Sequence, residues 1–396
     1  MRSIVISPEF QGFAEKTPIQ RSVYKLYNLL YNVNRRKKGE KMNIGERLKS
    51  VRLQAGLSQR DLAEKVDVSA QAVSKYERGM DTPSSPVLIR LAKALGVRVE
   101  YLLRPINITL SQPQYRRRAA LSKKNENEIQ ARVQDWLERY LGIETILASQ
   151  SEFKMPEIKR HAKNLEDVEQ VAVGLRKSWN LGIDPIDGLA EILEENGIKV
   201  GILPAADSFD ALTLYANETT PVIAVKEGLP GDRQRFNLAH ELGHIILDLP
   251  QSWDVKQVEN AAFRFAGAFL APASSARLEL GERRQRLDMY ELHLLKHKYG
   301  MSMQAWIYRA KDLKILSDAA AASMYRQFRS NGWYREEPGD RYPTEKLDRL
   351  ERLVIRAIAE DVISDSRASE LLGKPLAEFW KQASEQHEGF PLPAYR

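Results

Sequence analysis

The spacing of hydrophobic residues divides the chain into regions that predict different structures. From Asn43 to Leu103, apolar residues recur at helical spacing in short segments, which predicts an all-α domain over residues 43–104. The next stretch, Arg104 to Lys124, holds six basic residues, no acids and two prolines, and an amphipathic helical pattern follows it. We therefore expect a linker and a connecting helix over residues 105–160.

Helical and strand-like patterns alternate in the middle of the chain. Two helical patterns cover residues 165–180 and 185–196, and three strand-like runs follow at residues 198–203, 212–217 and 221–226. From residue 235 onward the pattern is helical through Trp380. These patterns predict an α+β domain over residues 161–280, its helical extension over residues 281–340, and a helical C-terminal tail over residues 341–396. The fold class is therefore multidomain.

The composition narrows the classes of site that the chain can build. Hydrophobic residues make up 43% and charged residues 29%, and there is no cysteine. The absence of cysteine excludes disulfides, cysteine-ligated zinc and thiol catalysis, so any metal site must use His, Asp or Glu. No apolar run approaches the roughly 18 residues that span a bilayer, and the N-terminus lacks a secretory pattern. We expect a cytoplasmic protein without a membrane partner.

The net charge of +7 lies mostly in a basic extension over residues 1–42, which holds nine basic and three acidic residues. Gly39 and Glu40, flanked by lysines just before Met42, are what a purine-rich ribosome-binding site encodes when it is translated. We therefore expect the natural start at Met42, so that this extension is not native. The alternative is a basic arm that contacts DNA phosphates.

Two short helical patterns near the N-terminus have the spacing of a helix-turn-helix. Ser58 is a candidate N-cap for a helix over residues 59–66, and Ser69 is a candidate N-cap for a second helix that ends at Arg78 and Gly79. Two short helices joined by so tight a turn predict a motif whose second helix enters the major groove.

This segment resembles the Cro/C1-type helix-turn-helix of the Xre family in "LAEKV", "VSAQAVSKYERG" and "LIRLAKALGV". The resemblance implies a double-stranded DNA operator as partner, bound by a homodimer on a palindromic site. It implies base contacts by Ala70, Gln71, Ser74 and Lys75, and phosphate contacts by Gln59, Ser69 and Arg78. The alternative is a helix-turn-helix that serves only dimerisation or protein contact.

The stretch "HELGH" carries the second candidate chemistry. His240 and His244 lie four residues apart, so on a helix they share one face and can bind one metal ion. Glu241 is offset by one residue, where it can act on a bound water. A catalytic zinc site needs a third protein ligand and an open position. The alternative is two histidines on a partly buried helix.

Residues 258–272 form a second amphipathic helical pattern with Glu259 near its start, the candidate third ligand. His293 and His297 are also four residues apart, but lysines surround them, and we interpret them as a solvated helix face. Arg233 and Arg235 precede the motif, and we expect them to stabilise local structure.

The arrangement "RQRFNLAHELGHIIL…VENAAFRFAGAFLAP" resembles the ImmA/IrrE family of zinc metallopeptidases, in the form preceded by a Cro/C1-type helix-turn-helix. The resemblance implies a zincin-like metallopeptidase fold for the α+β domain, with supporting segments between Glu166 and Pro338. It implies Zn²⁺ bound by His240, His244 and Glu259, with Glu241 as general base. Phe263 and Ala271 depart from the family pattern, and neither is a proposed ligand.

The resemblance further implies a transcriptional regulator that cleaves, or otherwise acts on, a repressor or partner protein in stress or mobile-element regulation. The alternative is a non-catalytic, antitoxin-like repressor that uses the peptidase fold to bind a partner; a zinc enzyme for small amides ranks below both. A substrate would lie beside the strand at residues 221–226 as an added edge strand. Tyr215, Arg233 and Arg235 are candidate oxyanion donors.

Overall fold

The computed structural model describes residues 44–104, 106, 108–111, 114–115 and 122–386. The basic extension over residues 1–42 and the expected start at Met42 lie outside the described residues. The chain divides into two compact units. The first comprises residues 1–107 with 144–148, and the second comprises residues 108–143 with 149–396.

The first unit is a bundle of short helices, as the hydrophobic pattern predicts. Its helices are α2 (Gly45–Gln54), α3 (Gln59–Val66), α4 (Ala70–Glu77), α5 (Ser85–Ala94) and α6 (Val99–Leu102). Ser58 begins α3 with a capping box, and Ser69 caps α4 by accepting the Ala72 N–H. Asp67 in the turn between them has φ 51°, and Gly79 after α4 has φ 67°. The buried core consists mainly of Leu, Val and Ala side chains.

A buried ion pair joins α2 to the end of α4. Arg52 binds Glu77 through two contacts, Nε to Oε1 at 2.5 Å and one terminal nitrogen to Oε2 at 2.9 Å. The other terminal nitrogen of Arg52 donates to the Leu57 carbonyl at 2.7 Å. A Cβ at Gly45 would lie 2.5 Å from the Glu77 carbonyl oxygen, so only glycine lets the two helices approach this closely. The ion pair between Arg52 and Glu77 therefore fixes the C-terminal end of α4 against α2.

The second unit is built around a sheet of four strands in the order β1-β3-β4-β2. The strands are β1 (Gln114–Tyr115), β2 (Lys199–Leu203), β3 (Ala211–Ala216) and β4 (Thr220–Lys226). β3 and β4 form an antiparallel hairpin, whose turn places both Asn217 and Glu218 at positive φ, whereas β2 runs parallel to β4.

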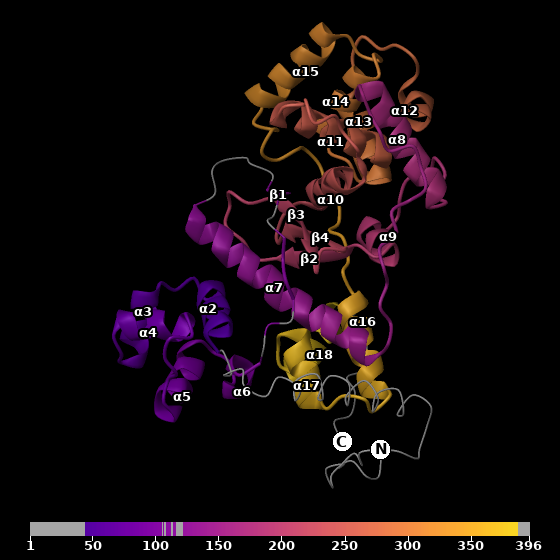
Figure 1. Ribbon diagram of the computed structural model, residues 1–396. Coiled ribbons are helices and arrows are strands. Elements are labelled where there is room, and N and C mark those ends of the chain that lie inside the picture. The colour runs from indigo at the N-terminus through magenta and orange to yellow at the C-terminus, as the bar shows by residue number, and fades with distance from the viewer. Residues whose placement is uncertain (1–43, 105, 107, 112–113, 116–121, 387–396) are drawn as a thin grey trace. The chain divides into compact units, whose positions relative to one another are not determined.

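The strand order corrects one prediction. β4 pairs with β3 on one side and with β2 on the other, so residues 221–226 are not free to accept an added edge strand. The β3 edge away from β4 is instead the one nearest the candidate base, and β1 lies against it (Figure 1). The linker pattern gave no indication of β1, whose two residues are too few for a periodic signal.

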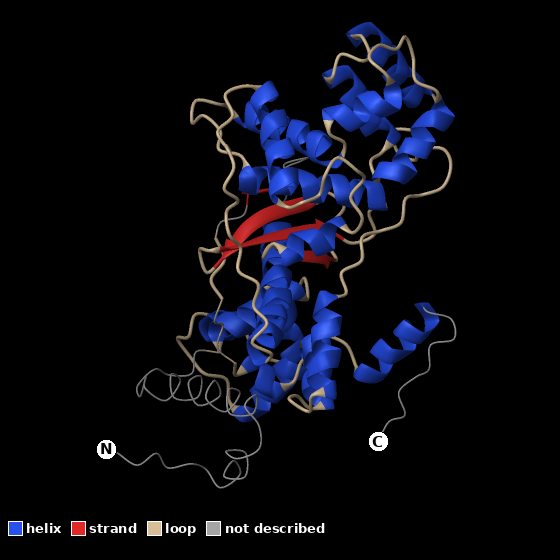
Figure 2. Cartoon of the chain, turned by 90° about the vertical axis from the view of Figure 1, so that its right-hand side faces the viewer, coloured by secondary structure: helices blue, strands red, loops and turns tan. Residues whose placement is uncertain are grey.

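The side chains of β3 and β4 alternate between two hydrophobic cores. Leu212, Leu214, Val222 and Ala224 pack in one core with α7 (Lys123–Ile146), whose Trp136 ring lies against Gly201 of β2. Ile223 and Val225 pack in the larger core on the opposite face, among the helices that carry the candidate site. Helices thus cover both faces of the sheet (Figure 2).

The remaining helices surround this framework and complete the fold class predicted from the sequence. They are α8 (Leu165–Ser178), α9 (Leu189–Glu195), α10 (Gly231–Ile246), α11 (Val255–Leu270), α12 (Ala273–Leu280), α13 (Met289–Tyr299), α14 (Met303–Asp312), α15 (Asp318–Ser330), α16 (Arg349–Ala359), α17 (Asp365–Leu372) and α18 (Leu376–Gln386). In the described part of the chain, no helix is both long and apolar enough to cross a membrane.

A buried charge network holds α8, α11 and α14 together. Glu169 of α8 binds Arg309 of α14 through both carboxylate oxygens, at 2.5 and 2.7 Å, and also binds Arg264 of α11 at 3.1 Å. Burial alone would raise the pKa of Glu169, but the hydrogen bond and charge of Arg309, together with Arg264, outweigh it and lower the pKa below its ordinary 4.5. The network therefore fixes the helix that carries Glu259.

We expect Glu169→Gln to lower the free energy of unfolding by about 3–5 kcal/mol, because the buried Arg309 loses its carboxylate partner and Arg264 keeps only Asp312. Since the folded-state pKa is depressed, this stabilisation is fully present above about pH 4.5 and is lost as the pH falls through the lowered value. Urea unfolding at several pH values measures both effects. Glu64→Gln, in an exposed pair with Arg60, serves as control and should change stability by less than about 1 kcal/mol.

Candidate functional site

Helix α10 carries the "HELGH" motif through the centre of the second unit. Its N-terminus passes so close to residue 343 that a Cβ on Gly231 would lie 1.9 Å from the Pro343 carbonyl oxygen. Farther along, Gly243 faces α11, where a Cβ would meet the Phe265 ring at 3.1 Å. This close packing of α10 against α11 brings His240 and His244 to the start of the neighbouring helix.

Three polar side chains converge where these helices meet. His240 Nε2 lies 3.3 Å from Glu259 Oε2, His244 Nε2 lies 3.4 Å from Glu259 Oε1, and the two histidine nitrogens lie 3.1 Å apart. His240 is fully buried, and the Phe263 ring packs against it at a centroid distance of 4.6 Å. Among the described residues, this is the one cluster of His and acidic side chains with the proximity that a metal ion needs.

The donor set fits zinc. Zinc–nitrogen and zinc–oxygen distances of about 2.0–2.2 Å in a tetrahedral site separate neighbouring ligand atoms by about 3.3 Å. The two histidine nitrogens lie 3.1 Å apart, and each lies 3.3 or 3.4 Å from one of the two Glu259 oxygens, which is close to that value. Burial alone would raise the pKa of Glu259, but its contacts with His240 and His244 outweigh burial and hold the pKa well below the usual range. Three ligands of this kind would leave a fourth position for water.

Glu241 projects from α10 toward the sheet rather than toward Glu259. It is fully buried, and its Oε2 accepts a hydrogen bond of 2.6 Å from the Thr213 hydroxyl of β3. Thr213 fixes the orientation of this carboxylate, a role that the sequence patterns did not indicate. The available signal was the strand alternation, which puts a polar residue on a buried face that is otherwise apolar.

Tyr215 lies two residues beyond Thr213 on β3, so its side chain leaves the same face of the strand. Burial raises the pKa of its hydroxyl, which therefore stays protonated and able to donate. Arg233 binds Asp210 at 2.6 Å, and Arg235 is buried against Glu345 at 2.5 Å and the Ile186 carbonyl. Both arginines thus have structural partners, as expected, although these partners lie 23 to 110 residues away in the chain. Tyr215 remains the oxyanion candidate that is not engaged in an ion pair among the described residues.

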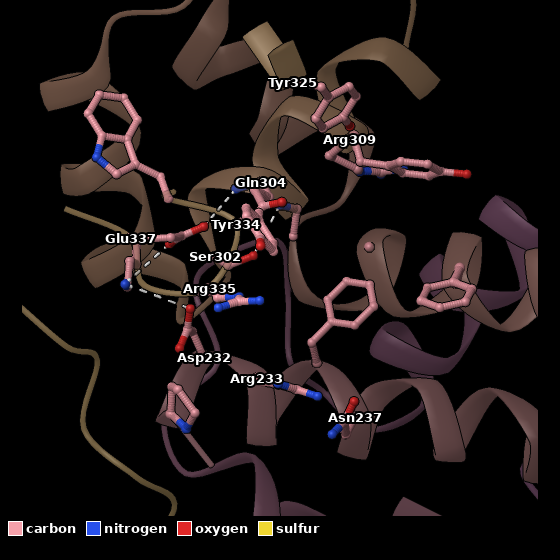
Figure 3. A pocket seen from close by; sticks show the side chains of 18 of the residues that line it. Asp232, Arg233, Asn237, Ser302, Gln304, Arg309, Tyr325, Tyr334, Arg335 and Glu337 are labelled. Atoms are coloured by element: carbon pink, nitrogen blue, oxygen red, sulfur yellow. Dashed lines mark hydrogen bonds and ion pairs between the residues drawn. The ribbon is translucent and has the colours of Figure 1, made fainter. Parts of the chain in front are cut away.

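A cavity of about 580 Å³ lies near this cluster, lined by residues of α10, α11, α14 and α15 and of the segment 333–341. None of the three candidate ligands lines it, but Phe263, whose ring packs against His240, does. Arg233 and Asn237 lie on one side of it, and Tyr325 and Arg309 lie on the other (Figure 3). Its wall is rich in aromatic rings, contributed by Phe236, Phe263, Tyr308, Tyr325, Trp333 and Tyr334. The buried Tyr325 hydroxyl has no hydrogen-bond partner among the described residues, and Arg335 has no carboxylate partner there.

The interpretation of His293 and His297 as a solvated face is wrong. Both side chains are half-buried, and their rings pack 4.6 Å apart under the segment at Gly339 and Asp340. Lys296 between them is buried and binds Asp232 and Glu337. A loop far along the chain covers this face, which local spacing could not reveal.

The predicted DNA-contacting residues are distributed over α3 and α4 of the first unit. Ala70, Gln71, Lys75 and Arg78 are exposed, and Ser74 is half-buried. Ser69 is exposed, and its hydroxyl caps α4. The Gln59 amide donates to Glu77 at 2.7 Å, so part of its hydrogen-bonding capacity is used within the domain. Their contacts with DNA stay predictions.

Comparison with protein families places both units. Residues 48–102 match the helix-turn-helix family, and residues 193–311 match the IrrE N-terminal-like domain of the peptidase M78 family. The second match contains the whole cluster of His240, His244, Glu259 and Glu241.

Individual relatives match over shorter stretches. The HTH-type transcriptional regulator ImmR of Bacillus subtilis is 32% identical over 88 residues, 22% of this chain and 59% of ImmR. The Pyrococcus furiosus protein PF1851 is 36% identical over 109 residues, 28% of this chain and 32% of that protein. The prophage-derived HTH-type transcriptional regulator YonR of Bacillus subtilis, named as uncharacterized, is 38% identical over 60 residues, 15% of this chain and 56% of YonR. The matched stretches thus span less than two thirds of each relative.

We expect the purified chain to contain about one zinc ion, because its donor set and spacing suit one tetrahedral ion. A His240→Ala/His244→Ala variant should lose the zinc, which elemental analysis of chelator-free protein would detect. The matched control is His293→Ala/His297→Ala, a second histidine pair at the same spacing that should retain the full zinc content. Equal zinc in both double variants would contradict the site.

Proposed function

We propose that this chain, which carries a helix-turn-helix domain followed by an IrrE N-terminal-like domain, is a DNA-binding transcriptional regulator with a zinc-dependent endopeptidase domain. The observation that supports peptidase chemistry best is the convergence of three ligand atoms beside a buried carboxylate that is not one of them. The similarity to ImmR, an HTH-type transcriptional regulator, supports the regulatory part.

Each residue of the candidate site has a separate role in the proposed reaction. His240, His244 and Glu259 would hold the ion, which when bound polarises a carbonyl and lowers the pKa of its water to about 7. Glu241 accepts a proton from the attacking water and later passes it to the leaving amine. Thr213 keeps the Glu241 carboxylate in one orientation throughout, since its hydroxyl already donates to Oε2. Tyr215 donates to the developing oxyanion.

The substrate that suits this site is a polypeptide rather than a small amide. A cavity of about 580 Å³ has the size of a site for a drug-sized molecule and exceeds what one small amide fills. Aromatic rings around it would bury bulky apolar side chains on one side of the scissile bond. We infer that a repressor or partner protein is the substrate, cleaved within an extended segment.

The competing function is a regulator that binds its partner without turnover. The buried contact between Glu241 and Thr213 argues against it, because zinc binding needs no fixed carboxylate outside the ligand set. Burying a carboxylate also costs free energy, which one hydroxyl hydrogen bond offsets only in part. The two functions differ in their response to one substitution.

We expect Glu241→Gln to retain zinc and the fold but to lower the rate of substrate cleavage by about 10²–10⁴-fold, because the amide cannot accept the proton. Cleavage of a partner protein, followed by gel electrophoresis beside the zinc content, measures this. Glu218→Gln, in the exposed hairpin turn, is the control and should leave the rate unchanged. Regulation that proceeds normally with Glu241→Gln would favour the non-catalytic alternative.

On the DNA side, Lys75→Ala should lower discrimination among operator bases by about 1–3 kcal/mol, because its ammonium reads a base edge. Arg78→Ala should weaken binding to all sequences alike and reduce the salt dependence, because it contacts phosphate. Binding titrations with matched and mismatched duplexes at two salt concentrations separate the effects. Lys93→Ala, an exposed lysine on α5, is the control. Equal losses from Lys75→Ala and Arg78→Ala on every duplex would contradict the assignment.

A further inference from the structure

The outer edge of β3 is covered by an extended piece of the chain that precedes α7. We call this piece the strap and define it as residues 108–111 and 114–115. The Ser111 N–H donates to the Tyr215 carbonyl at 2.9 Å, and the Tyr215 N–H donates to the Ser111 hydroxyl at 2.9 Å. Farther along, the Asn217 N–H donates to the Thr109 carbonyl at 2.9 Å. The strap therefore satisfies the backbone groups that an edge strand would otherwise expose.

The strap follows β3 past the residue that orients the candidate base. Gln114 pairs with Thr213 and Tyr115 with Leu212 in antiparallel register, and Leu110 forms a bridge with Ala216. Thr213 is the residue whose hydroxyl donates to Glu241. An extended chain on this edge thus runs beside the catalytic carboxylate, whereas the β2 edge lies two strands farther away.

Extended peptides bind proteins by adding a strand to an exposed sheet edge, with backbone hydrogen bonds for affinity and side-chain pockets for specificity. We propose that the outer edge of β3 is the docking edge for an extended segment of the protein substrate, and that the strap is an internal occupant which competes with it. That the docked segment is a substrate rests on the proposed peptidase function. That an extended segment and the strap compete for the edge of β3 does not rest on that function.

The anchoring of the strap is uneven, which suits an occupant that can leave. Ile108 is 8% exposed and packs into the core with α7, and Leu110 is half-buried against the same core, so these two side chains anchor one face of the strap. Thr109 and Ser111 are exposed and are held by hydrogen bonds to β3 and to the hairpin turn. A tethered segment of this length competes at an effective concentration near millimolar, so a peptide at micromolar concentration is excluded while the strap is paired.

The test is binding of a fluorescent peptide with the sequence of residues 106–116, INITLSQPQYR, to the full chain in its metal-free form, which allows no turnover. Ser111→Pro removes both the N–H and the hydroxyl that bind Tyr215, and should raise the affinity for the peptide by on the order of tenfold. Ser111→Thr keeps both groups and should bind the peptide as weakly as the unaltered chain.

Hydrogen exchange gives a second readout that a merely destabilised variant would not reproduce. The amides of Tyr215 and Asn217 donate to the strap, so their exchange should accelerate in Ser111→Pro and slow again when the peptide is added. Asn217→Gly is an independent variant, since it keeps the positive φ of the turn but removes the side chain that binds Thr109. It should also raise peptide affinity.

Equal peptide affinity in the unaltered chain and in both folded variants would overturn the proposal, as would peptide binding that leaves the exchange of Tyr215 and Asn217 unchanged. Peptide binding with restored protection, in a chain whose zinc-loaded form cleaves no partner protein, would support the docking edge and count against the peptidase function instead. The two proposals therefore fail in distinguishable ways.

Discussion

The close contact between α10 and α11 is the constraint on which the candidate metal centre depends. Gly243 has no side chain, and a methyl group there would press against the Phe265 ring at 3.1 Å. The small size of Gly243 therefore allows α10 to pack this closely against the helix that carries Glu259. The opposite side of α10 is held by the Thr213 contact, and its N-terminal half is held by the ion pair between Arg235 and Glu345. The ligand atoms thus converge because their helix is fixed from several directions.

Both units use a buried arginine–carboxylate contact to position a functional helix. In the first, Arg52 and Glu77 join α2 to the end of α4, the helix predicted to enter the major groove. In the second, Glu169 ties α11 to α8 and α14 through two arginines. Such contacts contribute little net stability relative to apolar packing, but removing one partner leaves an uncompensated charge. They favour one arrangement of the helices over alternatives, which a binding surface or a metal site requires.

Sequence signals within a few residues correctly predicted the features that depend on residues close together in the chain, such as helix bounds and shared helix faces. The cap at Ser58 gave the bounds of α3 as residues 59–66, and the four-residue spacing of His240 and His244 placed both on one helix face. The family matches confirm the predicted resemblance of both units. What local spacing missed depends on contacts between distant segments. The role of Thr213, the burial of Lys296 and the position of β4 inside the sheet all follow from such pairing.

The strand order shows how a contact between distant segments, which local patterns do not report, changes the proposed mechanism. An apolar run such as residues 221–226 fits an edge strand or an inner strand equally well, because periodicity reports burial and not neighbours. The structure puts that run inside the sheet and leaves β3 at the side of the candidate base. One strand then has two functions, since its inward face fixes Glu241 and its outer edge offers backbone groups to an extended chain. An occupant of that edge lies next to the candidate base whether it is a substrate or the strap, because Thr213 both pairs with the strap and binds Glu241.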